Sequence, residues 1–74
     1  MRGRVRLGRI NSGALDGVGY DPESRILTVK FAGGGTYEYY QVEEQLYEEL
    51  LSSQPHPWAA VGEEVKSHPF RRIA

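Results

Sequence analysis

One stretch limits the possible folds more than any other: residues 26–42, where two β-rich runs flank the three consecutive glycines 33–35. A glycine loop between two such runs predicts an antiparallel β-hairpin. Because successive side chains of a strand point to opposite faces, Leu27, Val29 and Phe31 share one face of the first strand. The offset between the two strands then decides which face of the second strand joins the core.

The length of the glycine loop sets this offset. If the first two glycines alone form the turn, Val29 lies opposite Glu38 and a charged residue joins the apolar face. If all three glycines form the loop, Phe31 faces Tyr37 and Val29 faces Tyr39. A slip of one residue exchanges the two faces of a strand, so burial favours the second register. We therefore predict that Tyr37 and Tyr39 pack inward, although a pair of exposed tyrosines would instead suit the stacking of bases.

The rest of the apolar pattern predicts an α+β domain. Residues 14–20 form a strand before the hairpin, and the turn at 21–24 joins the two. Residues 42–51 carry an amphipathic helix, and a second, short C-terminal helix opens at Pro57. The predicted fold is a three-stranded antiparallel meander packed by these two helices, with residues 1–10 as a candidate fourth strand.

Length and composition set the domain organisation. Seventy-four residues make one small domain, and the absence of cysteine excludes disulfides and thiolate metal sites. We divide the chain into residues 1–10, a basic arm or edge strand, and residues 11–74, a single domain. No apolar run approaches the length of a membrane span or a secretory signal, so we expect a cytoplasmic protein without a membrane partner.

Charge is unevenly distributed along the chain, although the net charge is only −1. Four arginines occupy the first ten residues, five glutamates lie between residues 38 and 49, and the C-terminal end is basic again. If the two basic ends meet in space, they neutralise several phosphates of a nucleic acid; otherwise they are scattered, solvated charges. The basic candidates for nucleic-acid binding are Arg2, Arg4, Arg6, Arg9, Arg25, Lys30, Lys66, Arg71 and Arg72.

Two aromatic residues add to these candidates. Tyr40 projects from the face opposite the core, beside Lys30, where it suits contact with a base or a protein, although Glu38 on that face repels phosphate. Trp58 is a second residue that we expect to contact bases. Near the C-terminus, we expect Phe70 and Ile73 to pack back onto the domain, between arginines that stay solvated.

Catalysis has little support in the sequence. His56 and His68 are each followed by proline, and neither shows the spacing of a metal site. No serine lies in a nucleophile elbow, and the three glycines lead into a strand rather than a phosphate-binding helix N-terminus. We expect no enzyme activity, catalytic residue, metal, cofactor or small-molecule substrate.

Several short motifs together resemble the KTSC domain family. These motifs are Ser12, the run 18–21, the alternation Leu27, Val29 and Phe31, the Gly-Gly-Thr of residues 34–36, the Tyr37-Glu38-Tyr39 hallmark, and Val42 followed by Tyr47 and Leu50. The resemblance covers about residues 12–51 and weakens beyond. It implies a small bacterial domain that occurs alone or at the carboxyl end of some lysyl-tRNA synthetases, and for which RNA binding has been proposed.

The leading hypothesis is therefore an accessory, non-catalytic module that binds nucleic acid. RNA, either tRNA or single-stranded, is preferred on the grounds of the resemblance alone. The alternative hypothesis is a small protein-interaction module, which docks on a protein partner through the open face of the sheet or the acidic helix.

Overall fold

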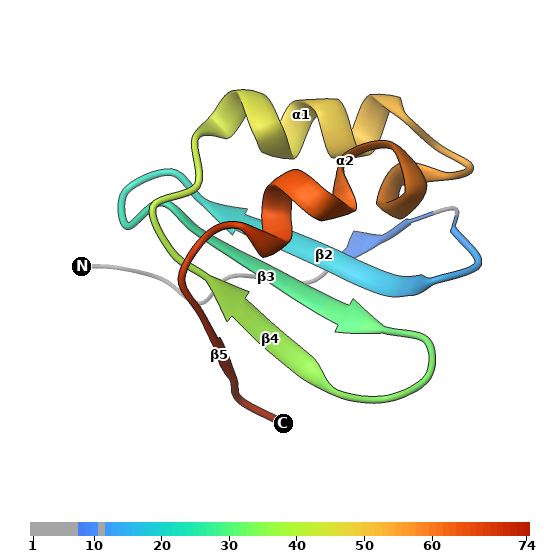
Figure 1. Ribbon diagram of the computed structural model, residues 1–74, viewed down its shortest axis with the longest axis horizontal. Coiled ribbons are helices and arrows are strands. Elements are labelled where there is room, and N and C mark those ends of the chain that lie inside the picture. Colours follow the sequence, from blue (N-terminus) through green and yellow to red (C-terminus); the bar gives the residue numbers. More distant parts are fainter. Residues whose placement is uncertain (1–7, 11) are drawn as a thin grey trace.

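The computed structural model describes residues 8–10 and 12–74, without the side chain of Arg9. The elements are β1 (Gly8–Arg9), β2 (Leu15–Asp21), β3 (Ile26–Phe31), β4 (Thr36–Tyr39), α1 (Glu44–Ser52), α2 (Pro57–Lys66) and β5 (Phe70–Arg72). The strands form one antiparallel sheet in the order β1-β2-β3-β4-β5. Both helices cover the same face of this sheet (Figure 1). The predicted α+β fold, its central meander and its N-terminal strand are confirmed.

The hairpin register is shifted by two residues from the predicted one. Val29 pairs with Tyr37, and Leu27 pairs with Tyr39, whereas we expected Phe31 opposite Tyr37 and Val29 opposite Tyr39. An even shift keeps every side chain on its own face, since the alternation of a strand has a period of two. The prediction that both tyrosines share the face of Leu27 and Val29 is therefore confirmed.

The loop explains the shift. It includes Ala32, and the third glycine, Gly35, pairs with β3 instead of forming part of the loop. The Phe31 N–H donates to the Gly35 carbonyl at 3.0 Å, and the Gly34 N–H donates to the Phe31 carbonyl at 3.1 Å. Gly34 and Gly35 have φ angles of 110° and 93°. Glycine adopts such angles without the steric cost that a Cβ atom adds, so these two positions fix the turn.

The core lies between the sheet and the helices. Tyr39 is buried with a relative exposure of 4%, while Tyr37 is half-buried. On α1, Leu46 and Leu50 lie one turn apart and both face the sheet. The buried apolar residues are Ile10, Leu15, Val18, Leu27, Val29, Tyr39, Val42, Leu46, Leu50 and Val65. No helix in the described residues is long and apolar enough to cross a bilayer.

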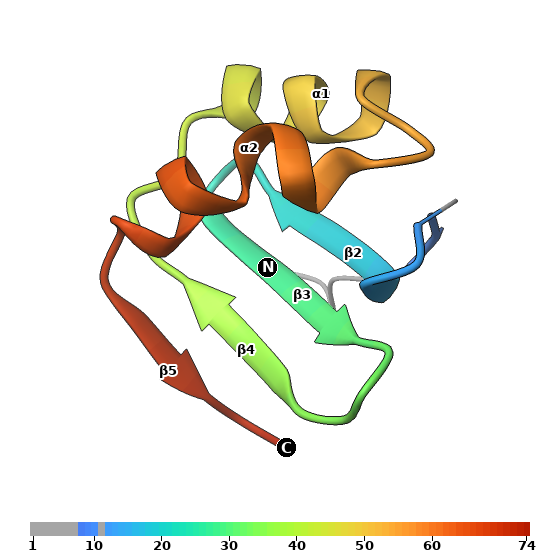
Figure 2. The ribbon, with the colours of Figure 1, turned by 45° about the vertical axis from the view of Figure 1, so that its right-hand side comes forward.

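The last strand, β5, was not predicted. It runs along β4 at the edge of the sheet, beyond the cover of the helices (Figure 2). Phe70 and Ile73 are exposed by 59% and 46%, so the expectation that both pack back onto the domain is wrong. Phe70 lies on the edge strand β5 and Ile73 directly follows it, so neither has the cover that the helices give to the central strands.

Candidate nucleic-acid interface

The two basic ends of the described chain lie at opposite edges of the sheet. Arg9 belongs to β1 and the pair Arg71 and Arg72 to β5, with three strands between them. Neighbouring strands are about 4.8 Å apart, so the two edges are separated by roughly 19 Å. The described residues therefore do not form one joint basic patch. The candidates Arg2, Arg4 and Arg6 lie outside the described residues.

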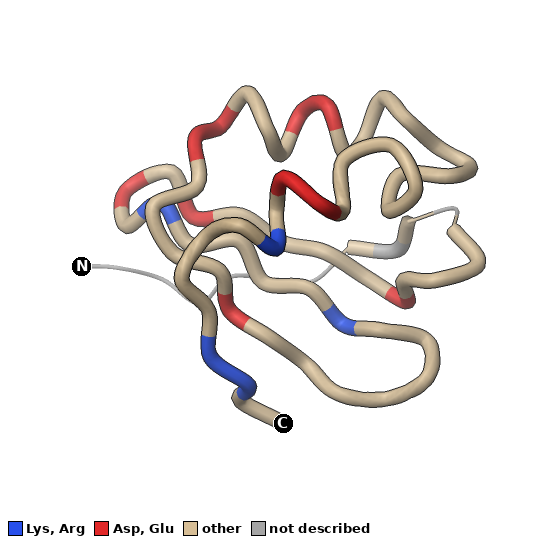
Figure 3. The backbone as a smooth tube through the Cα atoms, in the orientation of Figure 1, with Lys and Arg blue, Asp and Glu red and all other residues tan. Residues whose placement is uncertain are grey.

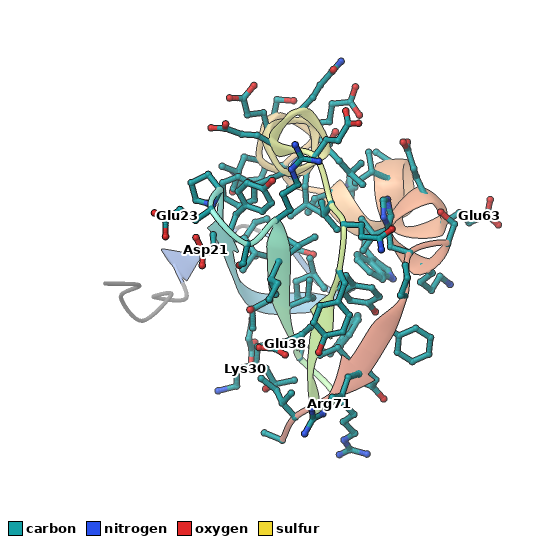
Figure 4. All side chains as sticks on the ribbon, turned by 90° about the vertical axis from the view of Figure 1, so that its left-hand side faces the viewer. Asp21, Glu23, Lys30, Glu38, Glu63 and Arg71 are labelled. Carbon is teal, nitrogen blue, oxygen red and sulfur yellow. The ribbon has the colours of Figure 1, made fainter. Side chains whose placement is uncertain are left out.

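The uncovered face of the sheet brings Tyr40 and Arg71 together around Glu38. The Tyr40 hydroxyl donates to Glu38 Oε1 at 2.8 Å, and this hydrogen bond raises the pKa of the Tyr40 hydroxyl above its ordinary value. Arg71 lies opposite Glu38 in the ladder. Figure 4 shows Glu38 and Arg71 at the end of the molecule away from the helices. Glu38 and Arg71 are thus cross-strand neighbours of opposite charge, which leaves little net positive charge there.

Lys30 and Arg25 lie apart from that cluster. Lys30 is exposed and pairs with Thr36, so the two-residue shift moves it away from Tyr40, which we expected beside it. Arg25 lies in the turn before β3 and lines a shallow depression together with Glu43 and other residues of the α1 entrance. A carboxylate beside this guanidinium opposes the binding of a phosphate.

An aromatic groove opens between the end of α2 and β5. We define the aromatic groove by its lining residues, which are Phe31, Gly34, Tyr37, Tyr39, Lys66 and Phe70, and its volume is about 540 Å³. The ring centroid of Phe70 lies 6.0 Å from that of Tyr37 and 5.9 Å from that of Tyr39. The Phe31 ring meets the Tyr37 ring edge-on at 5.6 Å. These rings form a continuous apolar floor.

A cation lies at each side of this floor. Lys66 ends α2 and is exposed. Arg72 pairs with Tyr37 across the strands, and its side chain lies beside Gly35, where a Cβ atom would be 3.6 Å from the guanidinium. Arg72 Nε donates to the carbonyl of Ala74 at 2.9 Å, which holds the side chain near the groove. None of the described residues that line the groove is acidic.

Acidic residues concentrate instead on the helical layer (Figure 3). Six exposed glutamates belong to α1, its entrance and α2: Glu43, Glu44, Glu48, Glu49, Glu63 and Glu64. Glu63 projects from α2 on the side opposite Lys30 (Figure 4). The charge asymmetry of the sequence thus becomes a separation in space, with a negative helical layer and positive charges beside the aromatic groove.

Trp58 lies behind the aromatic groove rather than in it. Its ring is half-buried, with its centroid 5.1 Å from that of Phe31 and 6.4 Å from that of Tyr39. The expectation that Trp58 contacts bases directly therefore does not fit its position. It supports the floor from the helix side.

Two parts of the interface escaped prediction from the sequence. Phe70 was expected to be packed, and Tyr37 was assigned to the core although it is only half-buried. A signal was present at residues 70–73, where two apolar residues enclose two arginines directly after a proline. The described residues contain no group of three potential metal ligands.

Comparisons with known proteins give the following similarities. A model of the KTSC domain matches residues 11–57. A protein of Tsukamurella paurometabola is 40% identical over 45 residues, which are 61% of this chain and 67% of that protein. An uncharacterised protein of Stutzerimonas stutzeri is 39% identical over 44 residues, which are 60% of this chain and 62% of that protein.

A solved structure extends the similarity to the C-terminal edge. The crystal structure of a KTSC domain protein from Yersinia pestis superimposes with a TM-score of 0.87 at 25% sequence identity. The match covers 96% of this chain and 100% of that one. The family model ends at residue 57, so Lys66 and Phe70 of the aromatic groove, and Arg72 beside it, lie outside the segment that the model describes.

Proposed function

The chain belongs to the KTSC domain family, and from this premise we propose that it is an accessory, non-catalytic RNA-binding module whose contact surface is the aromatic groove. The supporting observation is the ring of Phe70, which is 59% exposed and lies between the cations Lys66 and Arg72. The resemblance favours RNA over DNA. The proposed contact lies at one edge of the sheet and does not require the two basic ends to converge.

Exposure of Phe70 has an energetic cost that a ligand would offset. Burying a phenylalanine side chain fully stabilises a protein by about 1.5–3 kcal/mol, and Phe70 realises only part of this. An exposed aromatic ring that extends a larger apolar floor is typical of a binding surface. Stacking of a base on such a ring contributes about 1–3 kcal/mol and tolerates any sequence.

The charges determine which kind of ligand suits the groove. A peptide of apolar residues would fit the floor but would offer no negative charge to Lys66 and Arg72. A nucleic acid supplies both a flat base and phosphates, and each neutralised phosphate releases bound counterions. The glutamates of the helical layer repel the same phosphates. The backbone of a bound RNA is therefore expected to run along β5 between Lys66 and Arg72, away from the glutamates of the helical layer.

The experiment measures binding of fluorescein-labelled mixed tRNA and a single-stranded oligonucleotide by anisotropy, at low and moderate salt. We expect Arg72→Ala to weaken binding about threefold to tenfold at low salt, because one phosphate contact is lost. Arg71→Ala is the matched control, since Arg71 lies on the same strand but pairs with Glu38 on the other face. Absence of binding at low salt, or equal losses in both variants, would contradict the proposal.

A specific observation keeps a protein partner as the second candidate. The Ile73 N–H donates to the Thr36 carbonyl and the Tyr40 N–H to the Pro69 carbonyl, so the backbone groups of Phe70 and Arg72 point away from β4. A free strand edge of this kind accepts a further strand from a partner. A weak self-association in sedimentation that is insensitive to salt would favour this reading.

A further inference from the structure

We propose that the aromatic groove selects unpaired nucleotides: one base of a single strand stacks against Phe70 and Tyr37, and the flanking phosphates lie at Lys66 and Arg72. This inference rests on the proposed RNA-binding function and names its ligand. The inference predicts that the groove distinguishes single-stranded from double-stranded RNA. The proposed function alone predicts no such distinction.

Ring geometry provides the space for a base. The Phe70 ring is tilted by 52° from the Tyr37 ring and by 38° from the Tyr39 ring, so it lies flat against neither. Tyr37 and Tyr39 are nearly parallel, with an interplanar angle of 28°. The Phe70 side chain also lines the groove and is 59% exposed, so a face of its ring is accessible to a ligand. A planar aromatic ligand can lie against this face, as bases do on the aromatic side chains of single-strand binders.

Paired bases cannot use this surface. In a duplex the base faces are covered by neighbouring base pairs, and an A-form helix presents mainly phosphates and 2′-hydroxyl groups at its surface. The contact of a duplex would be reduced to Lys66 and Arg72. The apolar floor between them would stay empty.

The surroundings of the groove also oppose a second strand. Glu63 and Glu64 are exposed on the last turn of α2, three and two residues before Lys66. A rigid duplex carries a dense row of charge on both strands, and some of its phosphates would approach these carboxylates. A single strand is flexible, so its backbone can turn along β5 and remain near Arg72.

The first test varies the ligand and leaves the protein unchanged. One labelled RNA strand is titrated alone, annealed to its complement, and with abasic sites in place of its bases. We expect the duplex and the abasic strand to bind about tenfold more weakly than the intact single strand, because the stacking contact is lost. Equal affinity for all three ligands would overturn the inference and leave RNA binding in place, whereas no binding of any ligand would refute the proposed function itself.

The second test changes a side chain of the groove floor and keeps the ligands the same. Phe70→Ala is expected to lower single-strand affinity about tenfold and to leave duplex affinity unchanged. Ile73→Ala is the matched control, since Ile73 is the other exposed large apolar residue of this segment. Folding of both variants is checked by circular dichroism. A Phe70→Ala protein that is folded and still prefers the single strand tenfold would show that the preference arises elsewhere.

The fluorescence emission of the single tryptophan, Trp58, gives a readout of binding in the aromatic groove. Trp58 contacts Phe31 and Tyr39, which line the groove from behind. We expect the intact single strand to change the Trp58 emission, and the duplex and the abasic strand to leave it unchanged. An emission change with all three ligands would contradict selective stacking.

Discussion

The side chain of Gly62 is a single hydrogen atom, and the absence of a methyl group at this position determines the packing of α2. A Cβ atom at this position would lie 2.9 Å from two ring carbons of Trp58, which is closer than such atoms approach. The glycine therefore lets the Trp58 ring lie against the helix backbone. This ring in turn contacts Phe31 and Tyr39 and supports the floor of the aromatic groove.

We expect Gly62→Ala to destabilise the protein by up to about 2 kcal/mol, measured by urea denaturation. Alanine in a helix normally gains about 1 kcal/mol over glycine, but the clash with the Trp58 ring costs about 1–3 kcal/mol and decides the sign. Gly33→Ala is the matched control, because no heavy atom lies within 4 Å of a Cβ atom there. A more stable Gly62→Ala protein would show that the ring moves freely.

At the level of the elements, the inward face of each hairpin strand was predictable from the sequence, but the register between the two strands was not. The alternation of Leu27 and Val29 fixes the inward face whatever the register, since a strand has a period of two. The register depends on which residues enter the loop, and the inclusion of Ala32 rather than Gly35 has no signal in a hydrophobic pattern. The family was predictable because its short motifs all lie within residues 11–57, most of them in this hairpin.

The missed element, β5, had no comparable local signal. It has three residues, follows a proline and pairs with β4, which lies about thirty positions earlier in the sequence. Its partner is therefore set by the tertiary fold. Because the aromatic groove depends on Phe70 in this strand, the candidate site was only partly predictable: Lys66 and Arg72 were found through their charge, and Phe70 was not.

The observed register makes a direct prediction for nuclear magnetic resonance. Residues 31 and 35 form a hydrogen-bonded pair, so Thr28 and Glu38 form a non-hydrogen-bonded pair, in which the Cα atoms are closest. We expect a strong cross-strand Overhauser effect between the Hα protons of Thr28 and Glu38. A contact between Thr28 and Tyr40 in its place would support the register that was first expected.

At the level of the whole molecule, negative charge concentrates on the helical layer and two cations flank the aromatic groove. The six exposed glutamates of the helical layer lie over one face, while Lys66 and Arg72 flank the aromatic groove at the edge. The summed field of such a distribution steers a charged ligand before contact is made. The nearly neutral net charge of −1 conceals this orientation.

We therefore expect the double variant Glu63→Gln, Glu64→Gln to bind single-stranded RNA about two- to threefold more tightly at low salt, with the gain lost at moderate salt. These carboxylates precede Lys66 on α2, and salt screens their repulsion over about 10 Å at 0.1 M. Glu48→Gln, Glu49→Gln on α1 is the matched control with the same change in charge. Equal gains in both variants would indicate an effect of net charge alone.

The hydrogen bonds at the end of the chain have a practical consequence. The Ala74 carbonyl accepts from the Thr36 N–H at 3.1 Å and from Arg72 Nε at 2.9 Å, so residue 74 is anchored where the second hairpin strand begins. A dye or purification tag fused after this residue would emerge next to Arg72. Such a fusion would shield the very site under study, whereas a fluorophore placed on α1 would leave it accessible.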